Sequence, residues 1–202
     1  GGVLSVELAL RGAKGPMQAL EGEKGLFKAM ADSVSIDSLF DGLGSDYYIL
    51  GQYIKFHAAC RHIHPTIDGL LNVMRDEALK FHDLDSIHIT TYPVAVSFCG
   101  AKELPDSAEG AKFSLAFSSA MAAYFGDAGE HRYTENTVAN SEIRALASRI
   151  TSGSCARWEK AYPRVRGAAL SIKTLKGQTY SIDVPLPNGE PENPATDEDF
   201  IR

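Results

Sequence analysis

The segment that most restricts the fold is an alternating stretch near the end of the chain. In "ALSIKTLKGQTYSIDV", residues 169–184, apolar and polar side chains alternate on both sides of Lys176–Gly177. Alternation with a period of two indicates strands, and a short turn that contains glycine between two such strands is typical of a β-hairpin. Together with the helical segments described next, this hairpin predicts an α+β protein.

Helical periodicity covers five other segments. Residues 1–12 and about 24–32 are predicted to be helical and are joined by a loop rich in glycine. From Pro65 to about His82, apolar residues recur at helical spacing, and proline suits the first turn of such an amphipathic helix. Residues 111–125, which end at a glycine, and residues 141–150 complete the helical set.

Two segments predict further strands. "YYILGQYI", residues 47–54, and "SIHITTYPVAVSF", residues 86–98, are rich in aromatic and β-branched side chains. Pro93 is expected to break or bulge the second strand, because proline lacks the N–H that a ladder needs. We therefore place an α+β domain at about residues 46–185, with helical pieces on either side.

Composition and charge restrict the class of protein. The chain has 202 residues, is 44% hydrophobic and carries a formal charge of −6 without a block of Lys and Arg. It can bury a core, and nothing in it predicts binding to nucleic acid or to a membrane. Three separated cysteines, an odd number, are not a disulfide framework and suit a reducing compartment such as the cytoplasm.

Both ends of the sequence look cut. Residue 1 is glycine rather than methionine, and the first helical segment begins without a capping residue. At the other end, Thr196 and Asp199 resemble a capping box that opens a helix. These features predict a fragment or one chain of a split protein, and an unprocessed natural terminus is the alternative.

Candidate chemistry concentrates in "KFHAACRHIHPTID", residues 55–68. A helix N-terminus attracts anions, and Lys55, Arg61, His62 and His64 lie in the loop before it or at its start. Arginine suits paired contacts to carboxylate or phosphate, and lysine suits a point-charge contact. The stretch therefore predicts an anion site, and a solvated basic loop is the alternative of similar weight.

Two further interpretations of this stretch remain open. His57, Cys60, His62 and His64 have the side chains that zinc prefers, but their spacing matches no standard structural zinc site. Cys60 could be a nucleophile, since a neighbouring arginine and a helix terminus favour a thiolate. Cysteine is more often simply buried, so we prefer a packing or substrate-shaping role for Cys60 and predict no metal.

Four segments resemble the 2-methylcitrate dehydratase (MmgE/PrpD) family, which also includes cis-aconitate decarboxylases and iminodisuccinate epimerases. Their order along the chain is the order in that family. In this sequence they read "LRGAKGPMQALEGEKGLFKAM", "KFHAACRHIHPTIDGLL", "GAKFSLAFSSAMAAYFGD" and "IKTLKGQTYSIDVPLPNGEPENPATDEDF". The resemblance covers nearly the whole chain.

The resemblance implies a two-domain, cofactor-independent and homodimeric enzyme in which a helical body and an α+β lid close over a small polycarboxylate. Residues 1–45 would end the helical domain, 46–185 would form the lid, and 186–202 would begin the returning C-terminal segment. The acid/base histidines of the family belong to a helical body outside these 202 residues. The chain alone is thus expected to be inactive without that body, supplied by the same gene product or by a partner chain in the cytoplasm or a mitochondrial matrix.

The resemblance also implies roles for single residues. Lys55 and His64 would be catalytic, with His64 moving a proton, and Cys60, Arg61, His62 and Phe117 would contact substrate. Dehydration removes a proton next to a carboxylate, so cations placed beside that carboxylate lower the barrier.

One departure from the family lies in "AKFSLAF", where Ala116 and Phe117 replace a proline and a tyrosine. A phenyl ring cannot donate a proton, which puts ordinary dehydratase or decarboxylase activity in question. Two classes of function follow. The chain is either the lid of a lyase or isomerase for a di- or tricarboxylate, or a non-catalytic binding or interaction module with the same fold.

Overall fold

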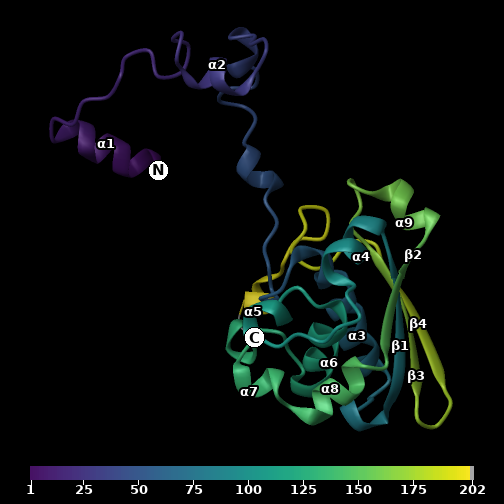
Figure 1. Ribbon diagram of the computed structural model, residues 1–202. Helices are drawn as coiled ribbons and strands as arrows, with labels where there is room; N and C mark the ends of the chain where they lie inside the picture. Colours follow the sequence, from purple (N-terminus) through teal and green to yellow (C-terminus); the bar gives the residue numbers. More distant parts are fainter. Residues whose placement is uncertain (201–202) are drawn as a thin grey trace. The chain divides into compact units, whose positions relative to one another are not determined.

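The computed structural model describes residues 1–200 and divides the chain into two compact units, Gly1–Tyr48 and a second that begins at Ile49 (Figure 1). The first unit contains α1 (Gly2–Leu10), α2 (Leu26–Met30) and the 3-10 turn η1 (Asp37–Leu39). None of these three elements contains a buried residue. The two predicted helices are present, each somewhat shorter than the pattern suggests.

The second unit is built on one mixed sheet. Its strands are β1 (Leu84–Thr91), β2 (Ile150–Ser154), β3 (Ala168–Thr174) and β4 (Thr179–Val184), in the spatial order β2-β1-β3-β4. β1 pairs with β2 in parallel and with β3 antiparallel, and β3 and β4 form the predicted antiparallel hairpin. With helices packed on this sheet, the α+β class is confirmed.

Helices cover one face of the sheet (Figure 1). α3 (His64–Asp76) packs against β3, β4 and α6 (Leu115–Phe125), and α6 packs against α8 (Ser141–Ala147) and β2. The remaining helices of this unit are α4 (Pro93–Cys99), α5 (Ala108–Ala111), α7 (Glu135–Val138) and α9 (Ala156–Ala161). Its 3-10 turns include η3 (Arg61–Ile63), η4 (Phe81–Asp83), η5 (Glu130–Arg132) and η6 (Asp197–Phe200).

The core lies between these helices and the sheet. Ile67 and Leu70 of α3 meet Ile87 and Ile89 of β1 in one apolar cluster, and all four are fully or nearly fully buried. α6 belongs to the same cluster and is buried around most of its circumference, which is why its hydrophobicity is not confined to one stripe. A second, smaller cluster forms around Tyr92, Ala95 and Trp158.

Three sequence-based boundaries were wrong. Residues 47–54 form no strand in the described structure; Tyr48–Gly51 is a 3-10 turn, η2, whose exposed residues pair with no neighbouring strand. The strand predicted over 86–98 ends at Thr91, so the break expected at Pro93 is confirmed, and Pro93 begins α4 because proline fits the first helical turn. The helix predicted to reach His82 ends at Asp76, and Ala78 beyond it has a positive φ of 52°.

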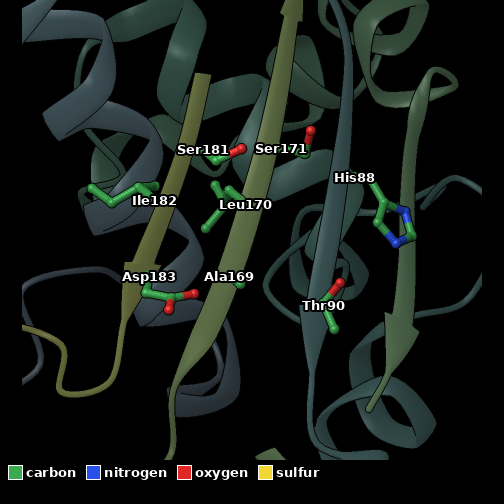
Figure 2. Close-up of a pocket in the computed structure, with 8 residues that line it drawn as sticks. All are labelled: His88, Thr90, Ala169, Leu170, Ser171, Ser181, Ile182 and Asp183. Carbon is green, nitrogen blue, oxygen red and sulfur yellow. The ribbon is translucent and has the colours of Figure 1, made fainter. Parts of the chain in front are cut away.

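The other face of the sheet is polar. His88, Ser181 and Asp183 are exposed there, and with Thr90 and Ser171 they line an open hollow of about 400 Å³ (Figure 2). Alternation explains this face, because the neighbours of these residues along each strand turn inward to the core.

Candidate functional site

Backbone hydrogen bonds hold the candidate anion loop, residues 55–64, in one path. The N–H of Ala58 donates to the Ala128 carbonyl at 2.9 Å, and the N–H of Cys60 donates to the Lys112 carbonyl at 2.8 Å. Directly before the loop, the N–H of Ile54 donates to the Gly189 carbonyl at 2.8 Å. The loop is thus fixed by the α5–α6 corner on one side and by the chain after β4 on the other.

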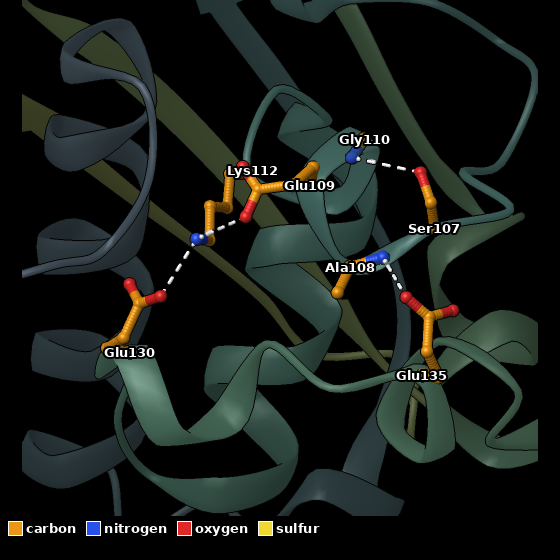
Figure 3. A network of polar contacts seen from close by, with 7 residues as sticks. All are labelled: Ser107, Ala108, Glu109, Gly110, Lys112, Glu130 and Glu135. Carbon is orange, nitrogen blue, oxygen red and sulfur yellow. Dashed lines mark hydrogen bonds and ion pairs between the residues drawn. The ribbon is translucent and has the colours of Figure 1, made fainter.

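A polar network steadies the α5–α6 corner (Figure 3). The Nζ of Lys112 donates to Glu109 and to Glu130, at 2.9 Å each. Ser107 caps α5 by accepting from the N–H of Gly110. Because both charges near the ammonium group are carboxylates, the pKa of Lys112 is raised, chiefly by its hydrogen bond to Glu109. Lys112 therefore has a structural role. Its side chain links Glu109 to Glu130, and its carbonyl accepts the hydrogen bond from the N–H of Cys60.

The segment after β4, residues 186–193, which we call the tail loop, lies on the anion loop. Gly189 has a φ of +87°, and a Cβ there would lie 2.4 Å from the Ile54 carbonyl oxygen, so only glycine fits. The N–H of Asn188 donates to Oδ2 of Asp68 at 2.8 Å. Two segments far apart in sequence therefore build one site.

Arg61 is the central cation of this site. Its side chain is buried, with the whole residue only 6% exposed, and the guanidinium lies 4.6 Å above the Tyr53 ring centroid. Nη2 lies 2.6 Å from Oε1 of Glu190 in the tail loop. That contact has the distance of an ion pair but not the geometry of a hydrogen bond, and Nε, Nη1 and Nη2 all lack a hydrogen-bond partner among the described residues.

Two histidines and an aspartate lie beside it. Nε2 of His57 is 2.7 Å from Oδ1 of Asp68, so the carboxylate that accepts from Asn188 also orients this imidazole. The rings of His57 and His64 are 5.0 Å apart between centroids. Nε2 of His64 donates to the Ala59 carbonyl at 3.4 Å, and its Nδ1 is buried without a partner among the described residues.

Burial makes His64 a neutral imidazole. Desolvation, followed by the nearby charges of His57, Arg61 and Lys55, lowers the pKa of His64 to about 2. At neutral pH this side chain therefore has no proton to give as an imidazolium. Its Nδ1 lone pair is the group that remains available for a proton or a hydrogen-bond donor, so the predicted role of His64 in proton transfer stays a prediction.

The other residues predicted for the site lie in different surroundings. Lys55 is exposed on the same loop. Nδ1 of His62 is 2.5 Å from the Tyr92 hydroxyl, and burial and then the charge of Arg166 lower the pKa of His62. Cys60 is half-buried and reduced.

The neighbour of Cys60, Cys99, has its pKa raised to about 12 by burial first and by the Cys60 thiol second. The thiol next to Cys60 is therefore protonated at neutral pH.

Phe117 lies inside the fold. It is fully buried in the main core cluster, and its N–H donates to the capping hydroxyl of Ser114 at 3.2 Å. No part of the ring reaches solvent in this unit, whereas Phe113 in the same segment is exposed. Its predicted contact with substrate stays a prediction, and its burial is the arrangement of a core residue.

The zinc interpretation gains no support from the geometry. Within residues 1–200, no three His, Cys, Asp or Glu side chains are gathered as a metal would need. His62 turns to Tyr92, while His57 turns to Asp68.

Sequence reasoning missed three residues of the site: Tyr53, Asp68 and Glu190. The sequence places Tyr53 in the strand predicted over 47–54 and Asp68 in the helix that starts at Pro65, and Glu190 falls in the segment 186–202, for which no site residue is expected. The signal for Glu190 was its charge between Gly189 and Pro191 in a segment that must bend back. Its partner could be known only from the path of the chain.

The fold and site together define an α+β domain in which one loop carries a buried guanidinium and an exposed ammonium. The family model of the MmgE/PrpD C-terminal domain matches residues 57–202, and the chain belongs to the MmgE/PrpD family. A search of curated proteins found no match. Across residues 1–200, every helix is too short or too polar to cross a bilayer.

Proposed function

We propose that this chain is the lid, or substrate-binding portion, of a cofactor-independent lyase or isomerase that acts on a small di- or tricarboxylate, as a 2-methylcitrate dehydratase-like enzyme would. Its family membership indicates a dehydratase-type enzyme at family level. The observation that carries the proposal is Arg61, a buried guanidinium whose nitrogens lack hydrogen-bond partners among the described residues.

The chemistry of the loop fits this class of ligand. A carboxylate that meets Arg61 gains N–H donors that are already desolvated, and a second carboxylate of the same molecule can meet the flexible ammonium of Lys55. When a proton leaves the carbon next to a carboxylate, negative charge builds on that carboxylate. Cations fixed beside it stabilise the transition state more than the ground state, which is what lowers the barrier.

The loop also holds groups that can exchange protons. The rings of His57 and His64 lie side by side, and Asp68 fixes His57 through its Nε2. A histidine oriented by a carboxylate presents its other nitrogen for proton transfer. We therefore assign anion binding to Lys55 and Arg61 and keep proton exchange as the proposed task of the histidine pair.

The test is substitution of Lys55, which is exposed and can be removed without leaving a buried charge. Lys55→Ala should weaken binding of citrate or 2-methylcitrate by about 10- to 150-fold, because a hydrogen bond to a charged group is worth ~1.5–3 kcal/mol. Calorimetric titration of the chain measures this change, and kcat/KM in the full enzyme should fall by about 10²-fold.

Lys176→Ala is the matched control, since Lys176 is an exposed lysine in the β3–β4 turn. Equal binding by the wild-type chain and by Lys55→Ala would contradict the proposal. Folding of each variant is checked by circular dichroism.

A further inference from the structure

We propose that the Glu190 carboxylate is a built-in stand-in for a ligand carboxylate, and that a small polycarboxylate displaces it from Arg61 on binding. The proposal rests on the proposed function for the class of ligand. It gives the tail loop a task that neither the family match nor the anion loop alone assigns.

Arg61 is incompletely paired. Oε1 of Glu190 lies 2.6 Å from Nη2, with the two side chains only 7% and 12% exposed. Even so, all three guanidinium nitrogens lack a hydrogen bond of acceptable geometry among the described residues. A buried guanidinium normally has its donors satisfied, because an unsatisfied buried donor is costly. Glu190 therefore compensates the positive charge of Arg61, but the N–H donors of the guanidinium lack hydrogen-bond acceptors among the described residues.

Glu190 presents its carboxylate to Arg61 from a fixed backbone, which limits how the two groups can align. The backbone of the tail loop is fixed on both sides of this residue. Gly189 donates to the Asn193 carbonyl at 3.0 Å, Asn193 donates to the Glu190 carbonyl at 3.0 Å, and the Gly189 carbonyl accepts from Ile54. Only the side chain of Glu190 can adjust. A free carboxylate has no such tether and can align with two N–H groups at once.

Exchange of the Glu190 carboxylate for a ligand carboxylate costs less than loss of Glu190 alone. Removing Glu190 without a replacement would leave a buried charge unpaired, which is strongly unfavourable. Replacing it by a ligand carboxylate keeps one anion at the guanidinium, and Arg61 is already desolvated. The Glu190 side chain already reaches the surface, with 12% of its area exposed, so rotation about its own side-chain bonds would take the carboxylate toward water. The exchange therefore retains the ion pair and adds the hydrogen bonds that Glu190 lacks.

The site would therefore select ligands by their negative charge. A neutral hydroxy compound cannot displace Glu190, because it would leave the buried guanidinium uncompensated. A carboxylate can. Lys55 on the same loop is exposed, and among the described residues no hydrogen bond or ion pair ties it to the tail loop, so it can hold a second carboxylate of the same ligand. The device favours di- and tricarboxylates over monovalent or neutral molecules.

The test compares citrate binding by the wild-type chain, Glu190→Gln and Glu192→Gln in calorimetric titrations. An intramolecular competitor raises the apparent Kd to the intrinsic Kd divided by the fraction of molecules in which the site is open. If that fraction is about 1–10%, Glu190→Gln should lower the Kd for citrate by roughly 10- to 100-fold. Glu192→Gln removes the same charge from the same loop at an exposed position and should change the Kd by less than about twofold.

Lys55→Ala in the same assay separates the two proposals. Suppose that Lys55→Ala binds citrate more weakly than the wild-type chain, while Glu190→Gln binds it equally or more weakly. That result would overturn the stand-in role of Glu190 and leave the anion site intact. An unchanged Lys55→Ala would overturn the proposed function. If neither the wild-type chain nor Glu190→Gln binds citrate, both fail.

A second measurement keeps the test decisive if Glu190→Gln folds poorly. Glu190→Asp retains the charge but withdraws the carboxylate by one methylene group, and it should also bind citrate more tightly. In the wild-type chain labelled with carbon-13, citrate should shift the side-chain carboxyl resonance of Glu190 and leave that of Glu192 in place. A Glu190 resonance that does not move at saturating citrate would contradict displacement.

Discussion

At the scale of the residue, His64 couples the site to pH. The folded-state pKa is about 2, below the ordinary value near 6.5, so the folded chain binds fewer protons than the unfolded chain between these two values. The stability that the neutral imidazole contributes is fully present above about pH 6.5 and is lost as the pH falls toward 2. The charged or titratable groups that face it are His57, Arg61 and Lys55.

We expect the free energy of unfolding to fall by about 2 kcal/mol between pH 7 and pH 5 through His64 alone. Urea unfolding at a series of pH values measures the slope, and His64→Gln should remove this part of it. His88→Gln is the control, because His88 is exposed on the outer face of the sheet and should leave the slope unchanged. Identical slopes for the wild-type chain and His64→Gln would show that His64 is not held neutral.

At the scale of the element, close packing beside β3 depends on a missing side chain. A Cβ at Gly167 would lie 2.3 Å from Cζ3 of Trp158 and 2.8 Å from the Val184 carbonyl oxygen. Trp158 is itself buried and cannot swing away. Glycine at this position lets the end of α9 approach the sheet and close the small cluster around Tyr92.

Gly167→Ala should therefore destabilise the fold by about 1–3 kcal/mol through overpacking. Gly153→Ala is the matched control in β2, since the nearest atom to a Cβ there lies 3.8 Å away, an ordinary contact. It should be neutral or slightly stabilising. Fluorescence of Trp158, the single tryptophan, follows unfolding in denaturant. Equal midpoints for the two variants would argue that Trp158 moves to accommodate the methyl group.

At the scale of the whole molecule, the two units differ in how they bury apolar surface. The unit that begins at Ile49 has a continuous core, while α1 buries no residue and exposes Val3, Leu4 and Val6 by 60–82%. Exposed apolar surface of this kind promotes association when nothing covers it.

We expect the 202-residue chain to self-associate with increasing concentration and a chain that starts at Ile49 to stay monomeric and folded. Sedimentation velocity distinguishes the two, and circular dichroism confirms that the sheet is retained. Leu4→Glu combined with Leu8→Glu in the full chain should reduce association as deletion does, since both side chains are exposed on α1. A monomeric wild-type chain would contradict this expectation.

Local patterns were enough for much of the fold. The β3–β4 hairpin follows from alternation around Lys176–Gly177, and Gly126 ends α6 as expected, although the helix predicted from residue 111 begins only at Leu115, after its cap Ser114. The family follows from segments whose residues are close in sequence. These signals succeed because hydrogen bonds, caps and periodicity act between residues a few positions apart.

Tertiary structure decided what local patterns could not. Residues 47–54 have the composition of a strand, but a strand needs a partner, and the sheet is complete without them. From the sequence alone, Arg61 is a cation without an assigned partner. The path of the chain after β4 brings Glu190 to Arg61 and Asn188 to Asp68. Sequence determined the hairpin, the longer helices and the place where cations gather, because those depend on neighbours along the chain. Only the folded backbone decided which charges meet, because that depends on distances between segments that sequence separates.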